Sequence, residues 1–449
     1  MTNPVPNQPP SRPPNQPRRR GACPGVLAPM EVGDGLLLRV RVPAGVLPAG
    51  HARRIAALGD RYGNGLIDLS QRGNLQLRGL SAEGLEPVTE ALRAMGYVAT
   101  DAASEAVRNV LCSPTAGLDP TAALDVRGAA RSLDARLADD TGLHRLPPKF
   151  GWLVCGGGIG HLADSSTDVR FDAVDGGRFQ LSLGGALAEA AVLGVCREDR
   201  LADVASALGR AFLELRDSLP EPPRRMAGLV AALGTEEIGR RLSPQISPLP
   251  PGERITVRGT HLMDVFGCAE PPHPIRLPGG EMEQSPALVT AFPFGRLTAA
   301  ALAALASACA EIRLTPWRAL LLVAPSKDAE PTARAHGAIL SHDDRRLKLT
   351  ACSGAGGCDV GTTDTHATAL AVAGRAGPLL EHVRMVHVSG CAKGCAHPAR
   401  ADVTLTARDG LYDVALNAKP GEAVLRAGLS PDDAAACVAD LLTEESSGA

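Results

Sequence analysis

The chain has 449 residues, of which 45% are hydrophobic and 21% are charged; at roughly 100–200 residues per domain this allows two to four domains and excludes a peptide hormone or small module. The 46 Lys and Arg residues nearly cancel the 49 Asp and Glu residues, for a formal net charge of −3. No overall field would attract nucleic acid or an anionic membrane, so any cationic binding site must be local.

The chain begins with a segment that predicts a tail rather than a domain. Residues 1–20 are rich in Pro, Asn and Gln, a composition that favours disordered, extended chain. Glu31 and Asp34 follow where an export signal would have its apolar core, and the longest apolar run, residues 299–309, is too short to cross a bilayer. We expect a cytoplasmic protein that does not enter the membrane, with reduced cysteines that bind metal rather than form disulfides.

Regular elements are expected from residue 35 onward. Alternation of apolar residues predicts three well-marked strands: residues 35–42, 169–174 and 401–405. Ser81 and Thr298 precede helical patterns, where their hydroxyls can cap a first helical turn. Residues 217–287 are Pro-rich and contain few long periodic runs, so we expect two halves of the chain to meet there.

An internal duplication organises these elements. Sequence blocks recur in the same order at an offset that drifts from 250 at Pro43 to 240 at Cys112: residues 38–48 and 288–298, 67–70 and 312–315, 75–77 and 320–322, and 108–117 and 348–357. Chance similarity between Ala- and Leu-rich segments is the alternative. We predict an α+β fold with mixed sheets, built of two homologous halves about a pseudo-twofold axis, with an active site in a cleft that both halves line.

Four of the 11 cysteines form a paired motif in the second half. Cys352 and Cys358 are separated by five residues, and Cys391 and Cys395 by three. Thiolates are the usual ligands of iron–sulfur clusters. Glycines crowd both loops, where they allow backbone to approach a cluster closely. The pair predicts one 4Fe–4S cluster.

Two other interpretations of the cysteines stay open. A structural zinc site also takes four cysteines, although its ligands are usually closer in sequence, and a disulfide is the second alternative. Cys112 is expected opposite Cys352, but Leu118 stands opposite Cys358, so the first half should hold no cluster. Small buried hydrophobes are the expected role of the isolated cysteines: Cys23, Cys112, Cys155, Cys196, Cys268, Cys309 and Cys437.

Basic residues occupy unusual settings in the first half. Arg72 and Lys149 each border an expected strand. Arg108 lies in the Arg-Asn-Val segment of the same half. A guanidinium or ammonium there could bind carboxylates or inorganic anions. Taken singly, each is more typical of a solvated surface charge, and their value comes from occurring together with the cysteines.

Together with the cysteines, these segments resemble the siroheme-dependent sulfite and nitrite reductase superfamily over nearly the whole chain after the tail. The shared features are Ser-x-Arg at Arg72, Arg-Asn-Val at Arg108, Pro-x-Lys-Phe at Lys149 and the paired cysteines. The resemblance implies pseudo-symmetric halves, each a ferredoxin-like half-domain plus a mixed-sheet α/β unit. It implies that Cys395 bridges the cluster to the siroheme iron, and that the three basic residues face the macrocycle and the reacting anion.

The domain limits expected from the resemblance start with a disordered tail over residues 1–20. They continue with ferredoxin-like half-domain 1 over 21–98, α/β domain 1 without a cluster over 99–245, a linker and ferredoxin-like half-domain 2 over 246–330, and α/β domain 2 with the 4Fe–4S cluster over 331–449.

Departures from the reductases point to one branch. The reductases have a second lysine where this chain has Gly151, and Pro and Asn where it has Ala392 and Lys393. The chain is also short for an assimilatory reductase. With the segments 20–35 and 389–398, these features are most similar to the precorrin-3B synthase branch of aerobic cobalamin biosynthesis.

That resemblance implies an O2-dependent monooxygenase. Its members convert precorrin-3A to precorrin-3B, placing a hydroxyl at C20 while the ring A acetate closes a γ-lactone. Arg72, Arg108 and Lys149 would then bind carboxylates of the tetrapyrrole, with Arg78 and Lys393 as further candidates.

The same resemblance implies the cofactors and partners. A 4Fe–4S cluster on Cys352, Cys358, Cys391 and Cys395 would relay electrons, and a mononuclear non-haem iron would activate O2. His366, His387 and His397 have no diagnostic spacing, so the ligands of that iron are not assigned. Residues 156–160 lack the spacing of a dinucleotide fingerprint, so electrons must come from outside, from NADH through a reductase or from ferredoxin. We expect a monomer that binds neither nucleic acid nor membrane.

Two alternatives remain in other reaction classes. The first is a sulfite or nitrite reductase that retains siroheme. The second is a non-catalytic cluster or zinc protein that acts as a sensor.

Overall fold

The structure is a computed structural model that describes residues 24–174, 176–242, 246–247, 259–260 and 287–447. The expected tail lies outside the described residues, as do Cys23 and Cys268. The chain divides into two compact units. One comprises Val32–Asp34 and Asp344–Ala449, and the other comprises Gly21–Glu31 and Gly35–Asp343.

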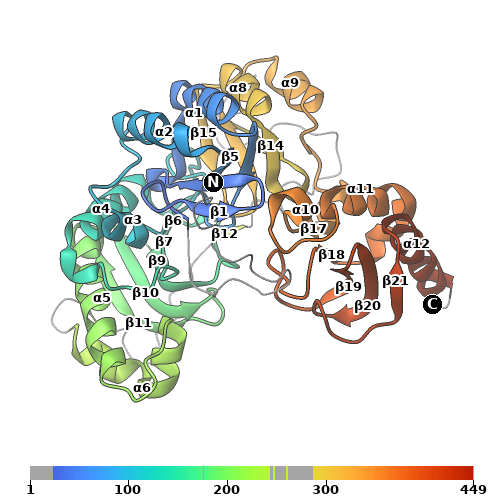
Figure 1. Ribbon diagram of the computed structural model, residues 1–449. Coiled ribbons are helices and arrows are strands. Elements are labelled where there is room, and N and C mark those ends of the chain that lie inside the picture. The colour runs from blue at the N-terminus through green and yellow to red at the C-terminus, as the bar shows by residue number, and fades with distance from the viewer. Residues whose placement is uncertain (1–23, 175, 243–245, 248–258, 261–286, 448–449) are drawn as a thin grey trace, which may run out of the picture. The chain divides into compact units, whose positions relative to one another are not determined.

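The larger unit contains two half-domains of the same design (Figure 1). The first consists of β1 (Met30–Val32), β2 (Gly35–Val40), β3 (Val46–Pro48), α1 (Ala49–Tyr62), β4 (Leu66–Leu69), β5 (Leu75–Leu80) and α2 (Ala82–Ala94). The second consists of β13 (Ala287–Ala291), β14 (Arg296–Thr298), α8 (Ala299–Ser307), β15 (Glu311–Leu314), β16 (Ala319–Val323) and α9 (Ala329–Ala335). The repeated order confirms the predicted duplication in this part of the chain.

Local chemistry explains where these elements begin. The turns Pro43–Gly45 and Pro293–Gly295 both end on a glycine with positive φ, 68° at Gly45 and 73° at Gly295, a conformation that glycine adopts at little cost. The hydroxyl of Ser81 accepts a hydrogen bond from Gly84 N at the start of α2. Thr298 caps α8 in the same way, as predicted.

The two half-domains exchange one short strand each. The sheets have the orders β1-β2-β5-β4-β14 and β13-β16-β15-β3, so β14 completes the first sheet and β3 completes the second. In the registers, Leu297 lies opposite Ile67 and Leu47 lies opposite Ile312. Helices α1 and α8 pack together over a single core shared by both half-domains, which makes the pair one body.

The first α/β domain completes the larger unit. Its elements are α3 (Ala102–Val107), β6 (Val110–Cys112), α4 (Arg127–Asp139), β7 (Trp152–Cys155), β8 (Gly158–Ile159), β9 (Thr167–Val174), β10 (Arg178–Gly185), β11 (Ala191–Arg197), α5 (Leu201–Asp217), α6 (Met226–Arg240) and β12 (Gly259–Thr260). The sheet order is β11-β10-β9-β7-β6, and β6, β7 and β9 run parallel.

The smaller unit repeats this architecture. Its elements are β17 (Leu349–Ala351), α10 (Gly354–Gly357), α11 (Thr365–Ala376), β18 (Val386–Ser389), β19 (Ala401–Arg408), β20 (Leu411–Ala418), β21 (Arg426–Leu429) and α12 (Pro431–Ser447). The order β17-β18-β19-β20-β21 has the same strand directions as the first domain, with β17, β18 and β19 parallel. The predicted α+β class with mixed sheets and repeated halves is confirmed.

The register of these sheets corrects one detail of the predicted repeat. Ser113 N donates to Val154 O in the first domain, and Cys352 N donates to Val388 O in the second. Ser113, and not Cys112, therefore occupies the position of Cys352. Aligned sequence blocks cannot fix such a one-residue shift, whereas strand pairing does.

Helix α6 lies within the Pro-rich segment, where few periodic runs were expected. Its three glycines weaken the helical pattern, and Gly234 has a non-helical φ of 75°.

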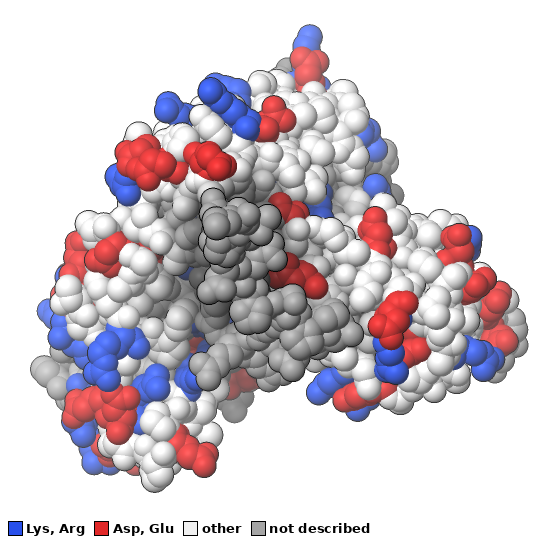
Figure 2. Space-filling view, in the orientation of Figure 1, with Lys and Arg blue, Asp and Glu red and all other residues white. Residues whose placement is uncertain are grey.

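No helix among the described residues is both long and apolar enough to cross a membrane. Basic and acidic side chains are intermixed over the face in Figure 2, in keeping with the small net charge.

Candidate functional site

The four predicted cluster cysteines lie on two neighbouring loops of the smaller unit. Cys352 and Cys358 follow β17, and Cys391 and Cys395 follow β18. Because β17 and β18 are adjacent and parallel, both loops leave the same edge of the sheet. Gly390 N donates a hydrogen bond of 3.1 Å to the Sγ of Cys352, which ties the two loops together.

The thiols of these loops influence one another's ionisation. Burial raises the pKa of Cys391, and the nearby thiols of Cys352 and Cys358 raise it further, while Lys393 opposes them. Burial likewise raises the pKa of Cys395. The charge of Lys393 lowers this pKa, and the other three thiols raise it. If all four thiols were ionised, their negative charges would repel one another unless a cationic core lay between them. The donor set therefore fits an iron–sulfur cluster.

Backbone clearance around the cysteines is also suited to a cluster. A Cβ added at Gly390 would lie 3.3 Å from the Sγ of Cys352. Gly354 has a φ of +60°, and a Cβ there would lie 2.6 Å from the carbonyl of Thr363. A Cβ at Gly33 would lie 3.0 Å from the backbone of Cys358, so the segment 32–34 approaches this ligand loop closely.

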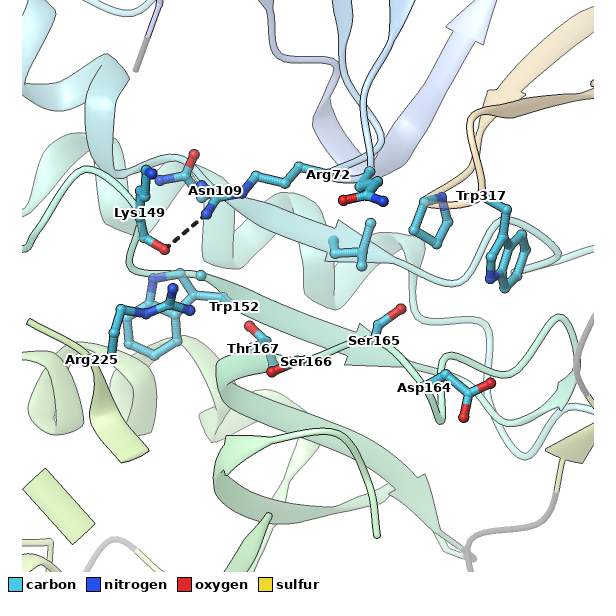
Figure 3. Close-up of a pocket in the computed structure, with 14 residues that line it drawn as sticks. Arg72, Asn109, Lys149, Trp152, Asp164, Ser165, Ser166, Thr167, Arg225 and Trp317 are labelled. Atoms are coloured by element: carbon cyan, nitrogen blue, oxygen red, sulfur yellow. Dashed lines mark hydrogen bonds between the residues drawn. The ribbon is translucent and has the colours of Figure 1, made fainter. Parts of the chain in front are cut away.

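A pocket of about 520 Å³ lies in the larger unit (Figure 3). It brings together Arg72, on the loop between β4 and β5, and Lys149, on the loop before β7. The guanidinium of Arg72 donates to the carbonyl of Lys149 at 3.3 Å. Residues of both halves line the pocket: Gln71, Arg72, Asn109, Leu111, Lys149, Gly151, Trp152, Asp164, Ser165, Ser166, Thr167, Arg225, Pro316 and Trp317.

Arg225 adds a third cation that sequence reasoning missed. It lies just before α6 and donates to both carboxylate oxygens of Asp168, at 2.9 and 3.0 Å. Asp168 is fully buried and also accepts hydrogen bonds from Gly151 N and Met226 N. One carboxylate thus orients a pocket cation and fixes the pocket backbone at Gly151. The only sequence signal was a pair of arginines at a helix start.

The walls of the pocket include two tryptophans. Trp152 begins β7, and Trp317 lies on the loop between β15 and β16. By strand register, Trp317 stands at the position that Arg72 occupies in the first half, because Ile67 pairs with Leu77 and Ile312 pairs with Leu322. The two equivalent loops contribute a cation and an aromatic face.

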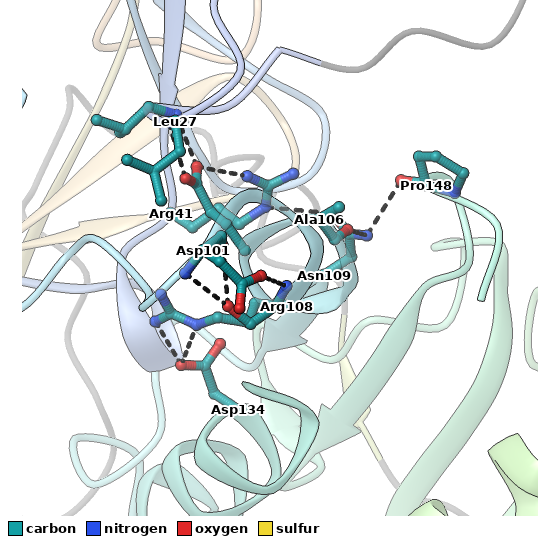
Figure 4. Close-up of polar contacts among 11 residues, drawn as sticks. Leu27, Arg41, Asp101, Ala106, Arg108, Asn109, Asp134 and Pro148 are labelled. Atoms are coloured by element: carbon teal, nitrogen blue, oxygen red, sulfur yellow. Dashed lines mark hydrogen bonds and ion pairs between the residues drawn. The ribbon is translucent and has the colours of Figure 1, made fainter. Parts of the chain in front are cut away.

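Arg108 is not among the residues that line this pocket, and its guanidinium points to Asp134 (Figure 4). Its guanidinium donates twice to Asp134, at 2.6 and 3.0 Å, and its side chain is only 6% exposed. Burial raises the pKa of Asp134, although the charge of Arg108 opposes this. These contacts favour support of the domain as the role of Arg108, and the predicted contact with substrate stays a prediction.

The neighbour of Arg108 links this buried network to the pocket. Asn109 lines the pocket and donates to the carbonyls of Ala106, Pro148 and Phe150. It also accepts from Arg41, which pairs with Glu105 at 3.1 Å. These contacts hold the chain on both sides of Lys149.

The two further candidate cations also have acidic or cysteine neighbours. Arg78 is buried and pairs with Asp68 at 3.0 Å, and Arg296 binds the same carboxylate. Burial would raise the pKa of Asp68, but the hydrogen bonds and charges of both arginines outweigh it and lower the pKa. Lys393 lies between Cys391 and Cys395, whose charges it offsets.

The structure brings two of the three named histidines together. The rings of His387 and His397 meet edge to face, with centroids 5.8 Å apart. Burial, with a smaller contribution from His397, lowers the pKa of His387 to about 4. This residue is therefore neutral at physiological pH.

Comparison with known proteins gives two family matches. Residues 28–95 match the nitrite/sulfite reductase ferredoxin-like half domain, and residues 103–247 match the nitrite and sulphite reductase 4Fe-4S domain. The second match covers the first α/β domain, whereas the paired cysteines lie in its repeat.

Individual relatives match over most of their length. A precorrin-3B synthase from Sinorhizobium sp. is 30% identical over 414 residues, covering 89% of this chain and 83% of that protein. A ferredoxin–nitrite reductase from Synechococcus elongatus is 27% identical, covering 82% and 75%. The solved structure of the Mycobacterium tuberculosis NirA protein is similar in fold, with a TM-score of 0.62 at 20% identity, over 89% of this chain and 78% of that one.

Proposed function

Since the chain belongs to the nitrite and sulfite reductase superfamily, in the branch that contains precorrin-3B synthase, we propose that it is the O2-dependent monooxygenase that converts precorrin-3A to precorrin-3B. In this reaction C20 gains a hydroxyl from O2, and the ring A acetate closes a γ-lactone. The second oxygen atom leaves as water, which takes two protons and two electrons from an external donor.

The observation that carries this proposal is the pocket that combines three cations with the exposed part of an aromatic side chain, Trp317. Precorrin-3A is a flat macrocycle edged with carboxylates. Arg72, Lys149 and Arg225 would bind these carboxylates through charge-assisted hydrogen bonds, and Trp317 would contact the apolar ring. Holding the macrocycle in one orientation supplies the regiospecificity at C20.

The chain's own residues prepare the pocket for this task. Asp168 orients Arg225 and holds Gly151 by a backbone hydrogen bond of 2.9 Å. Asn109 fixes the backbone beside Lys149 through the carbonyls of Pro148 and Phe150. Arg108, held by Asp134, supports the short segment between α3 and β6 that carries Asn109. These groups act by positioning, and none needs to touch the substrate.

The cofactors would supply the redox chemistry. Cys352, Cys358, Cys391 and Cys395 would hold a 4Fe–4S cluster, which passes electrons singly, and a mononuclear non-haem iron would activate O2. Gly390 would donate its N–H to the Cys352 ligand, as it does to the thiol, and Lys393 would offset negative charge at the cluster. We expect a cytoplasmic monomer that takes electrons from ferredoxin or from NADH through a reductase.

A direct experiment follows the oxygen atoms. The anaerobically purified protein is mixed with precorrin-3A, a reduced donor and heavy-isotope O2, and the product is weighed by mass spectrometry. We expect precorrin-3B carrying one labelled oxygen, and none when water carries the label instead. Consumption of O2 without labelled product would refute the proposed reaction.

A siroheme-dependent nitrite or sulfite reductase is the second candidate, because a nitrite reductase matches 82% of the chain. One contact opposes it. Gly151 stands where the reductases have a lysine, and a Cβ at this position would lie 3.1 Å from the Oγ1 of Thr167. Siroheme absorption bands with anaerobic six-electron reduction of nitrite or sulfite would favour this candidate. Zinc without sulfide would favour a sensor.

A further inference from the structure

The first α/β domain retains the loops of a cluster site without its cysteines. Gly156 N donates to the Oγ of Ser113 at 2.9 Å, just as Gly390 N donates to the Sγ of Cys352. Gly117 and Gly356 have φ values of 75° and 81°, and Gly160 and Gly394 have 80° and 62°. The loop conformations are thus repeated while the ligands have changed.

The repeat assigns each cluster ligand a counterpart. Ser113 corresponds to Cys352, Asp119 to Cys358, Gly157 to Cys391 and His161 to Cys395. Of these counterparts, Ser113, Asp119 and His161 have side chains that can bind a metal, but their donor atoms differ in chemistry.

One of these residues, His161, belongs to a compact group of potential metal ligands. The ligand atoms of Cys155, His161 and Asp172 all lie within 4.8 Å of one another, and all three residues are buried. His161 Nε2 is 3.8 Å from Asp172 Oδ1. Cys155 and Asp172 are directly opposite in the β7–β9 register, so the sheet itself sets their separation.

We infer that Cys155, His161 and Asp172 hold a single divalent transition-metal ion, iron(II) or zinc(II). One thiolate, one imidazole and one carboxylate suit ions of borderline softness and not magnesium or calcium. Three protein ligands leave room for an exogenous ligand, as in catalytic sites.

Residues around this group have the arrangement of a supporting shell. Arg170 donates to both oxygens of Asp172, at 2.7 and 2.9 Å, and each oxygen keeps a second lone pair for an ion. The Ser113 hydroxyl donates to the Cys155 sulfur at 3.3 Å. Asp119, which accepts from Ile159 N, lies on the same loop pair.

The site adjoins the pocket. Cys155 belongs to a small apolar cluster with Leu153 and Leu162, against which Leu111 and Trp317 pack. These last two residues also line the pocket. Arg170 further donates to the carbonyl of Ser165, another pocket residue. A bound ion would therefore lie behind the pocket wall.

The site stands on these contacts alone, and only the choice of iron rests on the proposed function. If the ion is iron, the site provides the mononuclear iron that an O2-dependent reaction requires. If it is zinc, the site is a fixed support for the pocket wall.

Metal content tests the inference without any assay of turnover. Iron, zinc and acid-labile sulfide are measured in the full-length protein purified without oxygen. A 4Fe–4S cluster contains iron and sulfide in equal numbers, so we expect iron plus zinc to exceed sulfide by about one ion per chain. The identity of the excess metal distinguishes iron from zinc.

Variants locate the excess ion. Cys155→Ser and His161→Gln should lose it and keep the sulfide, whereas Cys112→Ser should keep both, because Cys112 is a buried thiol on the neighbouring strand β6. No excess metal in the unmodified protein, or an excess that survives Cys155→Ser, would overturn the site.

A second measurement needs no variant that might misfold. Cobalt(II) is added to metal-depleted protein whose four loop cysteines still hold their cluster. We expect about one cobalt per chain, with a sulfur-to-cobalt charge-transfer band in the near ultraviolet. Absence of cobalt uptake would show that the group is only an ion-pair network centred on Arg170 and Asp172. Neither result depends on the reaction proposed above.

Discussion

The two α/β domains have the same strand order and the same loop conformations, yet they offer different chemistry. In each domain, the backbone N–H that follows the second strand donates to the side chain of the residue that follows the first strand. That residue is Ser113 after β6 in one domain and Cys352 after β17 in the other. The repeat shows that the fold supplies the loop pair and its N–H donors. The side chains on those loops then decide which metal group can bind.

The loops of the two half-domains differ in a similar way. Arg72 and Trp317 stand at equivalent positions, and both line the pocket. Duplication placed two copies of one loop at a single cavity, and divergence made one cationic and the other aromatic. An acidic, flat ligand benefits from both.

The largest expected effect comes from removing one of the proposed cluster ligands of the second half. Cys395→Ser should abolish the visible absorption of the cluster, the bound sulfide and the turnover, because its sulfur completes the four-ligand set. Cys437→Ser is the matched control on α12 and should change none of these. Equal losses in both variants would contradict the ligand assignment.

Removing the buried cation of the first domain should affect stability more than binding. Arg108→Ala leaves Asp134 buried without its partner, which should lower the free energy of unfolding by about 3–5 kcal/mol. Urea titration followed by the fluorescence of buried Trp152 measures this. A variant that keeps its stability but loses affinity for substrate would restore the original prediction for Arg108.

A pocket cation should behave in the opposite way. Arg72→Gln removes a charge-assisted contact of about 1.5–3 kcal/mol, so the Kd for the tetrapyrrole should rise by roughly 10- to 100-fold. Fluorescence titration of the folded variant checks this, with exposed Arg384→Gln as the control. An unchanged Kd would remove Arg72 from the binding site.

A smaller effect concerns His387, whose counterpart in the first domain is Leu153. The pKa of His387 is lowered to about 4 by burial, below its unfolded value near 6.5. The unfolded state therefore binds the proton first, and stability is lost as pH falls below 6.5, by about 2 kcal/mol at pH 5. His387→Leu, which copies the counterpart, should flatten this pH dependence. Identical unfolding curves at both pH values in the unmodified protein would contradict the burial argument.

The sequence predicted what local patterns determine. Caps at Ser81 and Thr298, the Pro-x-Gly turns and the paired cysteines are short motifs, and the structure has the turns and caps in place. Arg72 and Lys149 were proposed because their segments resemble a family, and both line the pocket. The partner of Arg108 was not predicted, because Asp134 lies 26 residues away and no local pattern links the two residues.

What was missed depends on pairing between distant strands. Cys155, His161 and Asp172 become neighbours only when β7 and β9 are in register, and Arg225 reaches Asp168 across 57 residues. A sequence of mixed Cys, His and Asp has no diagnostic spacing. The position of Ser113 needed the same information, because a one-residue shift is invisible in short aligned blocks.

Electron paramagnetic resonance of the dithionite-reduced protein would show whether the four loop cysteines hold a 4Fe–4S cluster. We expect the signal of one reduced cluster per chain, absent in Cys395→Ser, with no high-spin siroheme signal in the oxidised protein. A siroheme signal, or a cluster signal that survives Cys395→Ser, would contradict this expectation.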